Sequence, residues 1–339
     1  MTLTAKPVSR SAARQIEGGK KLTPELFQER FEAIVTNIEK VIKGKDRPIR
    51  LIVSAILAEG HVLLEDLPGT GKTMLARSIA QTIQADTNRI QCTPDLLPSD
   101  ITGSSVVDLA THEFKFRAGP VFTNILLADE INRATPKTQS SLLEAMQERR
   151  VTVDGITHDL PKPFLLLATQ NPIELAGTFP LPEAQLDRFL FKISLGYPEH
   201  AAEVEVLLAN FKAEAIDSLT PVCSVEDVLA LQAWPKDVQV SAAIMDYIVE
   251  ICQATRQDQS LQLPASPRAS LALMRAARVV AASYGREDVL PEDVKLVLGP
   301  VLAHRLALTP DAELRDDTIE KVVERISSRV KAPMGLQSS

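Results

Sequence analysis

The stretch HVLLEDLPGTGKT, residues 61–73, decides the fold of this chain. A short apolar run leads into a glycine-containing loop, and residues 74–83 then carry a helical pattern. This order predicts a phosphate-binding loop, in which backbone N–H groups and a helix N-terminus surround an anion. In such a loop a lysine reaches the β- and γ-phosphates and a hydroxyl binds Mg²⁺. Lys72 and Thr73 occupy those two places.

The loop departs from the strict pattern GxxxxGK[ST] at one position, because Asp66 stands where the first glycine is expected. The remainder, PGTGKT, is intact, and Gly69 and Gly71 allow the backbone to approach a phosphate closely. We expect nucleotide contacts from the following residues of the loop and the first helical turn: Pro68, Gly69, Thr70, Gly71, Lys72, Thr73 and Met74.

Further short apolar runs follow the first one along the chain. They are RIQC (89–92), ILLAD (125–129), FLLLAT (164–169) and FLFKI (189–193). Helical or loop segments separate them, which predicts an α/β fold with a parallel sheet flanked by helices. Residues 104–119 and 151–160 interrupt this alternation and are predicted to form two β-hairpin insertions. The pair Asp154-Gly155 in the second is a strong signal for a two-residue turn.

The helical pattern divides the chain. A first helix, capped by Thr23 and begun by Pro24, opens the sheet domain, and the residues after about Tyr197 are predicted to be almost entirely helical. We therefore expect a disordered basic arm (1–21), a nucleotide-binding α/β domain (22–196), a small all-helical lid (197–329) and a flexible tail (330–339).

Composition is that of a globular protein, with 45% hydrophobic and 24% charged residues among 339. A net charge of −7 counts against broad binding to nucleic-acid phosphates. No apolar run reaches the roughly 18 residues of a membrane span, so we expect no membrane insertion. The three cysteines and five histidines show no metal-ligand spacing, and a reducing, cytoplasmic location fits them.

Polar residues at the ends of two predicted strands complete a catalytic set. Asp129 ends ILLAD and can hold Mg²⁺, and Glu130 can polarise the water that attacks the γ-phosphorus. Asn171 follows FLLLATQ and can orient that water. The alternatives are a helix cap for the acidic pair and a polar turn for Asn171. Arg188 and Arg268 are candidate arginine fingers, and surface salt bridges are their alternative.

The order PGTGKT, ILLADE, ATQNP, LDRF and SPR resembles that of the AAA+ ATPases, and more closely their MoxR branch. The phrases that carry the resemblance are GHVLLEDLPGTGKT (60–73), TPDLLPSDITGS (93–104), LLADEINRATPKTQSSLLEAMQER (126–149), ATQNPIELAGTFPLPEAQLDRF (168–189) and SPRAS (266–270). Together they cover about residues 22–323, and aspartate in the first P-loop glycine position is usual for that branch.

The resemblance implies a role for each matching residue in the core of the site. Lys72 and Thr73 correspond to the Walker A pair, and Asp129 and Glu130 to the Walker B pair. Asn171 corresponds to sensor 1. ATP and Mg²⁺ are the ligands that this set implies.

The same resemblance implies roles for residues outside the loop. Arg188 matches the arginine finger, which acts on ATP bound by a neighbouring subunit, and Arg268 matches sensor 2, expected to act in cis from the lid. Val41, Ile42 and Gly44 would line the adenine pocket. The two hairpins match inserts that face the pore of a ring.

An arginine finger that acts in trans implies that hydrolysis depends on assembly, and the resemblance implies a ring, expected to be a hexamer. MoxR-like proteins resemble chaperones, so the expected partner is a client protein, with a von Willebrand factor A domain protein as one candidate. Two alternatives remain open. One is a nucleic-acid motor that would use Lys115, Arg117, Arg149 and Arg150 at the hairpins. The other is a switch that binds ATP to assemble and does not hydrolyse it.

Overall fold

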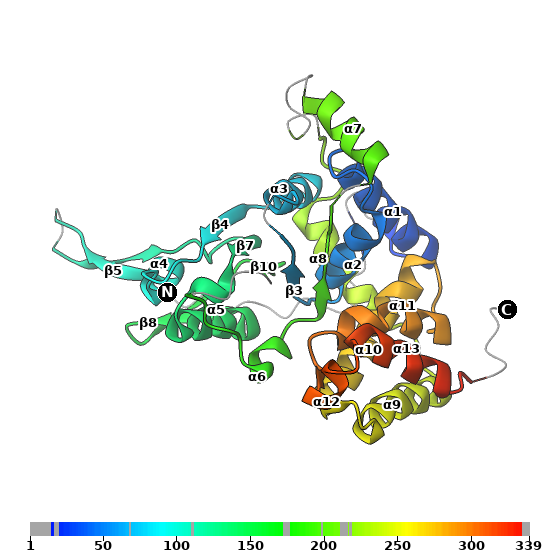
Figure 1. The fold of residues 1–339 in the computed structure, drawn as a ribbon. Coiled ribbons are helices and arrows are strands. Elements are labelled where there is room, and N and C mark those ends of the chain that lie inside the picture. Colours follow the sequence, from blue (N-terminus) through cyan, green and yellow to red (C-terminus); the bar gives the residue numbers. More distant parts are fainter. Residues whose placement is uncertain are drawn as a thin grey trace.

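The computed structural model describes residues 15–16, 20–67, 69–109, 112–171, 177–197, 199–210, 216 and 219–333 (Figure 1). Its elements are β1 (Gln15–Ile16), β2 (Lys20–Lys21), α1 (Pro24–Glu39), α2 (Asp46–Leu57), β3 (Val62–Glu65), α3 (Lys72–Thr82), β4 (Thr87–Gln91), α4 (Pro98–Thr102), β5 (Gly103–Val107), β6 (Phe114–Ala118), β7 (Ile125–Asp129), η2 (Ile131–Arg133), α5 (Pro136–Glu148), β8 (Arg150–Val153), β9 (Ile156–Asp159), β10 (Leu165–Gln170), α6 (Glu183–Leu186), β11 (Phe191–Ile193), α7 (His200–Asn210), α8 (Val225–Ala233), η3 (Trp234–Lys236), α9 (Ala242–Gln257), β12 (Leu261–Leu263), α10 (Pro267–Ser283), α11 (Pro291–Leu302), β13 (Ala307–Leu308), α12 (Pro310–Glu313) and α13 (Ile319–Arg329).

The five predicted strands form one parallel sheet in the order β11-β3-β10-β7-β4, as the sequence predicts. Successive side chains of a strand point to opposite faces. On β3, Leu64 joins the apolar cluster that includes α1, α2, α3 and the lid, whereas Leu63 joins the cluster under α5. The inner strands of the sheet are therefore buried on both faces, which explains why β3, β7 and β10 are continuous apolar runs, whereas the edge strand β4 is largely exposed.

Both predicted hairpins are present. β5 pairs with β6 and β8 with β9, each antiparallel. Asp154 and Gly155 both have left-handed backbone angles, with φ of 50° and 78°, as a type I′ turn requires. At the base of the first hairpin, a Cβ on Gly103 would lie 2.2 Å from the carbonyl oxygen of Arg117, so only glycine fits there. Figure 1 shows β5 projecting far from the body of the protein.

The second half of the chain is mainly helical, as predicted, and its helices pack on α1 and α2 (Figure 1). Ser224 and Asp227 form the expected capping box of α8. The helical prediction missed the short pair β12–β13, in which Leu261 lies opposite Leu308. Apolar residues of the lid and of the α1–α2 side of the sheet belong to one cluster, so the boundary at residue 196 stays a prediction.

Parts of the predicted arm and tail, and Pro68 of the loop, lie outside the described residues. Within the described ranges, no helix is both long enough and apolar enough to cross a membrane.

Candidate nucleotide-binding site

The glycines of the phosphate loop have left-handed backbone angles. Gly69 and Gly71 have φ of 85° and 86°, where any side chain would be strained. Gly71 is also the N-cap of α3, whose first N–H groups face the loop. The Lys72 ammonium donates to the carbonyl oxygens of Asp66 at 3.0 Å and Leu67 at 3.3 Å, so it lies across the loop that it is expected to serve.

A cleft of about 360 Å³ opens beside this loop. Its walls come from the loop, α3 and the carboxyl ends of β4, β7 and β10, which meet at one edge of the sheet. Its described lining residues are Asp66, Gly69, Thr70, Gly71, Lys72, Thr73, Met74, Arg89, Gln91, Asp129, Glu130, Thr169 and Asn171. The structure thus brings the predicted loop residues, the acidic pair and Asn171 to one cavity.

The two acidic residues are held by hydrogen bonds from their neighbours. Asp129 is buried, and it accepts from Nε of Arg89 at 2.6 Å and from the Thr169 hydroxyl at 3.3 Å. Glu130 accepts from Nε2 of Gln91 at 3.0 Å. Arg133 donates to the same Glu130 oxygen, Oε2, at 3.0 Å. Both carboxylates therefore have a cationic partner within the chain.

Sequence reasoning missed Arg89, Gln91 and Thr169. Arg89 and Gln91 alternate along β4 and so point to one face, which is a weak signal on its own. Their relevance depends on the register that sets Gln91 opposite Asp129, and a single sequence does not reveal that register. Beneath them, burial and the nearby carboxylates raise the pKa of the Cys92 thiol to about 12, so it remains a neutral thiol.

The donor set fits a hard divalent cation. The Thr73 hydroxyl and the Asp129 carboxylate line the same cleft, and oxygen ligands of this kind suit Mg²⁺. Asp129 would have to exchange its ion pair with Arg89 for a metal contact.

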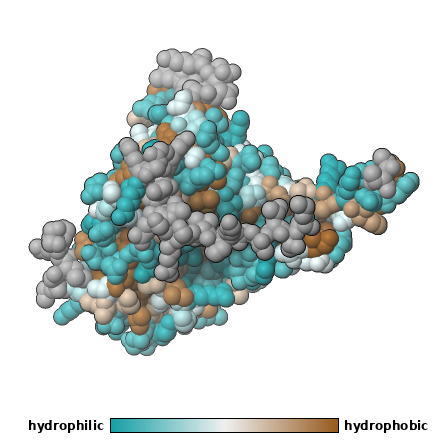
Figure 2. Space-filling view, turned by 180° about the vertical axis from the view of Figure 1, so that it is seen from behind, coloured by the Kyte–Doolittle hydropathy of each residue, from teal (hydrophilic) through white to brown (hydrophobic). Residues whose placement is uncertain are grey.

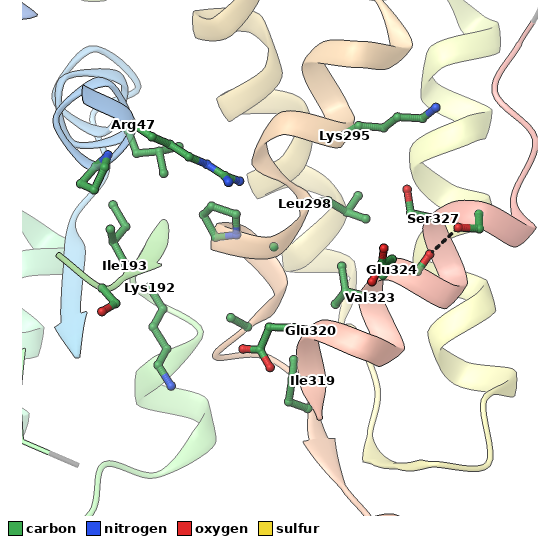
Figure 3. A pocket seen from close by; sticks show the side chains of 17 residues that line it. Arg47, Lys192, Ile193, Lys295, Leu298, Ile319, Glu320, Val323, Glu324 and Ser327 are labelled. Atoms are coloured by element: carbon green, nitrogen blue, oxygen red, sulfur yellow. Dashed lines mark hydrogen bonds between the residues drawn. The ribbon is translucent and has the colours of Figure 1, made fainter. Parts of the chain in front are cut away.

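The hydrogen bonds of Asp66 explain why an aspartate stands in place of the first glycine of the P-loop pattern. Its carboxylate is 5% exposed and accepts three hydrogen bonds from the segment that follows β11. The donors are the Ser194 hydroxyl at 2.8 Å, the Leu195 N–H at 2.6 Å and the Gly196 N–H at 2.8 Å. Ser194 also lines a cavity of about 480 Å³ between β11, α2 and the lid helices α11 and α13 (Figure 3). Asp66 therefore ties the phosphate loop to the seam between sheet and lid.

Arg188 lies at the opposite end of the sheet from the cleft. It comes three residues before β11, which runs parallel to β3 with Phe191 opposite Val62. The phosphate loop follows the other end of β3, and at about 3.3 Å per residue the strand separates the two by more than 10 Å. Arg188 instead lines a polar cavity of about 620 Å³ with residues of α5 and the β8–β9 hairpin.

Arg268 lies near Arg188. The Ser266 hydroxyl, two residues before Arg268, donates to Asp187 at 3.2 Å. Arg305, 6% exposed, also pairs with Asp187 at 2.7 Å and fixes this segment to the lid. Arg268 is not among the residues that line the cleft. These contacts do not support the expectation that Arg268 acts in cis, because they place it at the amino end of the sheet.

The expected adenine residues lie in the turn after α1. The N–H groups of Val41 and Ile42 bond to the Ile38 carbonyl at 3.1 and 2.9 Å, and neither side chain lines the cleft. Gly44 has φ of 68°, and a Cβ there would lie 2.9 Å from Cβ of Ala202. The adenine role stays a prediction.

The fold and the cleft define a P-loop protein of the AAA+ class. Residues 61–191 match the family described as "ATPase family associated with various cellular activities (AAA)", and residues 253–326 match the AAA lid domain.

Similar proteins narrow the class further. The chain is 42% identical to Chaperone MoxR1 of Mycobacterium tuberculosis, over 89% of this chain and 82% of that protein. It is 51% identical to the uncharacterized protein YeaC of Bacillus subtilis, with 88% and 94% covered, and 34% identical to Protein MoxR of Paracoccus denitrificans, with 86% and 92% covered. A crystal structure of a candidate ATPase from Cytophaga hutchinsonii superposes with a TM-score of 0.85 at 37% identity, covering 91% of this chain and 97% of that one. The chain belongs to the MoxR family of AAA+ ATPases.

Proposed function

We propose that the chain hydrolyses ATP with Mg²⁺ in a ring, that neighbouring copies share each active site, and that the ring remodels partner proteins. The proposal depends on the distance between two sets of predicted catalytic residues in the structure. Lys72 and Glu130 lie in the cleft, whereas Arg188 and Arg268 lie at the other end of the sheet. ATP in one cleft can meet those arginines only from a second copy. Head-to-tail contacts generate a ring when the rotation between copies closes, and we propose a ring of six copies here.

Within one cleft each residue has a distinct task in this proposal. Lys72 and the first N–H groups of α3 hold the phosphates. Thr73 and Asp129 hold Mg²⁺, which when bound neutralises charge on the phosphate oxygens. Asn171 orients the attacking water, and Glu130 accepts its proton.

The contacts of Glu130 suggest how hydrolysis is restrained. Its Oε2 accepts from Gln91 and Arg133, and both donors make the carboxylate a weaker base and fix its orientation. In this proposal, nucleotide binding moves both the end of β4, which carries Gln91, and η2, which carries Arg133, and so frees Glu130. Arg188 and Arg268 of the neighbouring copy then complete the charge balance on the γ-phosphate.

Asp66 couples the phosphate loop to the lid in this proposal, and Asp66→Ala tests that role. Charge-assisted hydrogen bonds contribute about 1.5–3 kcal/mol each but are not additive, so we expect unfolding by urea to show a loss of about 2–4 kcal/mol. We also expect ATP to stop changing hydrogen exchange at residues 194–197. Asp159→Ala, at an exposed hairpin position, is the control. Unchanged stability and unchanged ATP-dependent exchange would refute the coupling.

The projecting hairpin is the proposed contact for a client polypeptide. The exposed fraction of its apolar residues is 43% for Val106, 47% for Val107 and 77% for Phe114. Figure 2 shows apolar and polar residues side by side on this arm. Contiguous exposed apolar residues typically mark sites of protein interaction. One relative is named a chaperone, and by family resemblance a von Willebrand factor A domain protein is the candidate partner.

Three of the four hairpin cations considered for nucleic acid are paired within the chain. Lys115 binds Asp108 at 2.5 Å, Arg149 binds Glu59 at 2.7 Å, and Arg150 binds a glutamate of α5 at 3.3 Å. The acidic partners lower the local positive charge that a phosphate backbone would meet. These pairs favour a polypeptide client over a nucleic acid.

The ring proposal predicts that specific ATPase activity rises with protein concentration. Because one copy lacks a complete site, turnover should appear together with large assemblies. Activity and particle mass measured on the same samples, with and without ATP, check this. Flat activity from a monomer would refute the shared site, and assembly without turnover would identify a nucleotide switch.

A further inference from the structure

A further cavity, lined by several cationic side chains, lies between the base of the β8–β9 hairpin and the lid. It has a volume of about 330 Å³ and forms where the end of α2, the C-cap of α5, η3 and one face of α10 meet. Four cationic side chains line it, namely Arg149, Lys236, Arg275 and Arg278, together with the apolar side chains of Leu57, Leu271, Met274 and Val279. Among its described lining residues, Glu59 supplies the one carboxylate. The cavity therefore has a large excess of positive charge.

Glu59 balances only part of this charge. Its carboxylate binds Arg149 at 2.7 Å and also binds Lys236. Burial raises the pKa of Glu59, but the hydrogen bonds from Lys236 and Arg149 outweigh it and hold the pKa below its usual value. Glu59 is thus ionised and already shared between two cations. Its left-handed φ of 54° belongs to the turn that ends α2, where the Gly60 N–H donates to the Ala55 carbonyl at 2.7 Å.

Arg275 and Arg278 have no described carboxylate of their own in this cavity. The Nε of Arg278 is buried and finds no hydrogen-bond partner in the described part of the chain. A buried donor without an acceptor is unfavourable, so an anion that enters the cavity and accepts from it would be bound favourably.

The cavity opens on the same face of α10 as Arg268. Positions 268, 271, 275 and 278 are spaced by three or four residues, which places them on one side of a helix. Leu271, on this side, is 61% exposed. On the other flank, Arg149 lines this cavity while the next residue, Arg150, lines the cavity of Arg188. One continuous surface thus carries Arg188, Arg268 and the cationic cavity.

We infer that this cavity receives a carboxylate side chain from the neighbouring copy when the ring assembles. This inference rests on the proposed shared site. Guanidinium groups bind carboxylates through two parallel hydrogen bonds. A second copy is the occupant that the charges favour, since the chain has 44 acidic against 37 basic residues and its cleft side must face this surface. The exposed Leu271 adds apolar area to the same contact.

The test is a charge reversal, Arg275→Glu with Arg278→Glu, compared with Arg315→Glu and Arg329→Glu at exposed positions of the same lid. Particle mass with ATP is measured over a range of protein concentrations. We expect the cavity variant to need at least tenfold more protein to assemble, while the control pair assembles like the wild type. ATP affinity and melting temperature verify that each variant is folded. If the double charge-reversal variant does not fold, the milder variant Arg278→Gln is tested in its place.

Each other outcome counts against the inference. Assembly of the cavity variant at the wild-type concentration would refute it, as would equal loss in the control pair. If Arg278→Gln abolishes binding of inorganic phosphate but leaves assembly intact, the cavity is a small-anion site and not an interface. A wild-type protein that stays monomeric would refute the proposed ring itself. That result differs from the outcomes above, in which the wild type assembles and only the role of the cavity is refuted.

Discussion

Replacing Glu130 by glutamine is expected to lower ATP turnover by about 10²–10⁴-fold, the usual contribution of a general base, while ATP binding persists. The amide keeps the shape of the side chain and cannot accept the proton of the attacking water. Phosphate release under saturating ATP measures turnover, and equilibrium binding of a fluorescent ATP analogue measures affinity. Glu313→Gln on α12, an exposed position away from the cleft, is the matched control.

Two results would contradict the proposed role of Glu130 as the general base. Turnover within a few-fold of the wild type would show that another group accepts the proton. A large loss of ATP affinity would mean that Glu130 serves the architecture of the cleft, where Gln91 and Arg133 contact it.

Replacing Arg188 by alanine is expected to lower turnover by about 10³–10⁵-fold, the range observed for arginine fingers. The affinity of an isolated copy for ATP should not change, because Arg188 does not line its own cleft. Arg268→Ala should behave in the same way, since Ser266 holds it beside the same segment. Turnover and affinity measured on both variants check this. If Arg268→Ala instead weakens ATP binding by monomers, Arg268 acts in cis after all.

Local sequence patterns predicted most of the fold and the centre of the site. The loop, the five apolar strands and the Asp154-Gly155 turn are set by residues adjacent in the chain, so a single sequence is sufficient. The family relation likewise follows from contiguous phrases. The strand pair β12–β13 was not predicted because strands of two or three residues carry almost no periodic signal in the sequence.

Contacts between distant segments were not predictable in this way. The partners of Asp66 lie 128 to 130 positions away. The pairing of Arg89 with Asp129 depends on strand register, and the location of Arg268 depends on how α10 packs near Asp187. The sequence indicates that these residues are polar and placed near strand or helix ends, and only the tertiary fold decides which cleft each one faces.

Mixing two inactive variants tests the shared active site most directly. Arg188→Ala keeps a working cleft, and Lys72→Ala keeps the arginine. Combined in equal amounts, they should form a wild-type site at about a quarter of the head-to-tail interfaces if copies assemble at random. ATPase activity should therefore rise well above that of either variant alone, with a maximum near equal proportions. Mixtures that assemble and yet remain inactive at every ratio would contradict a site built from two copies.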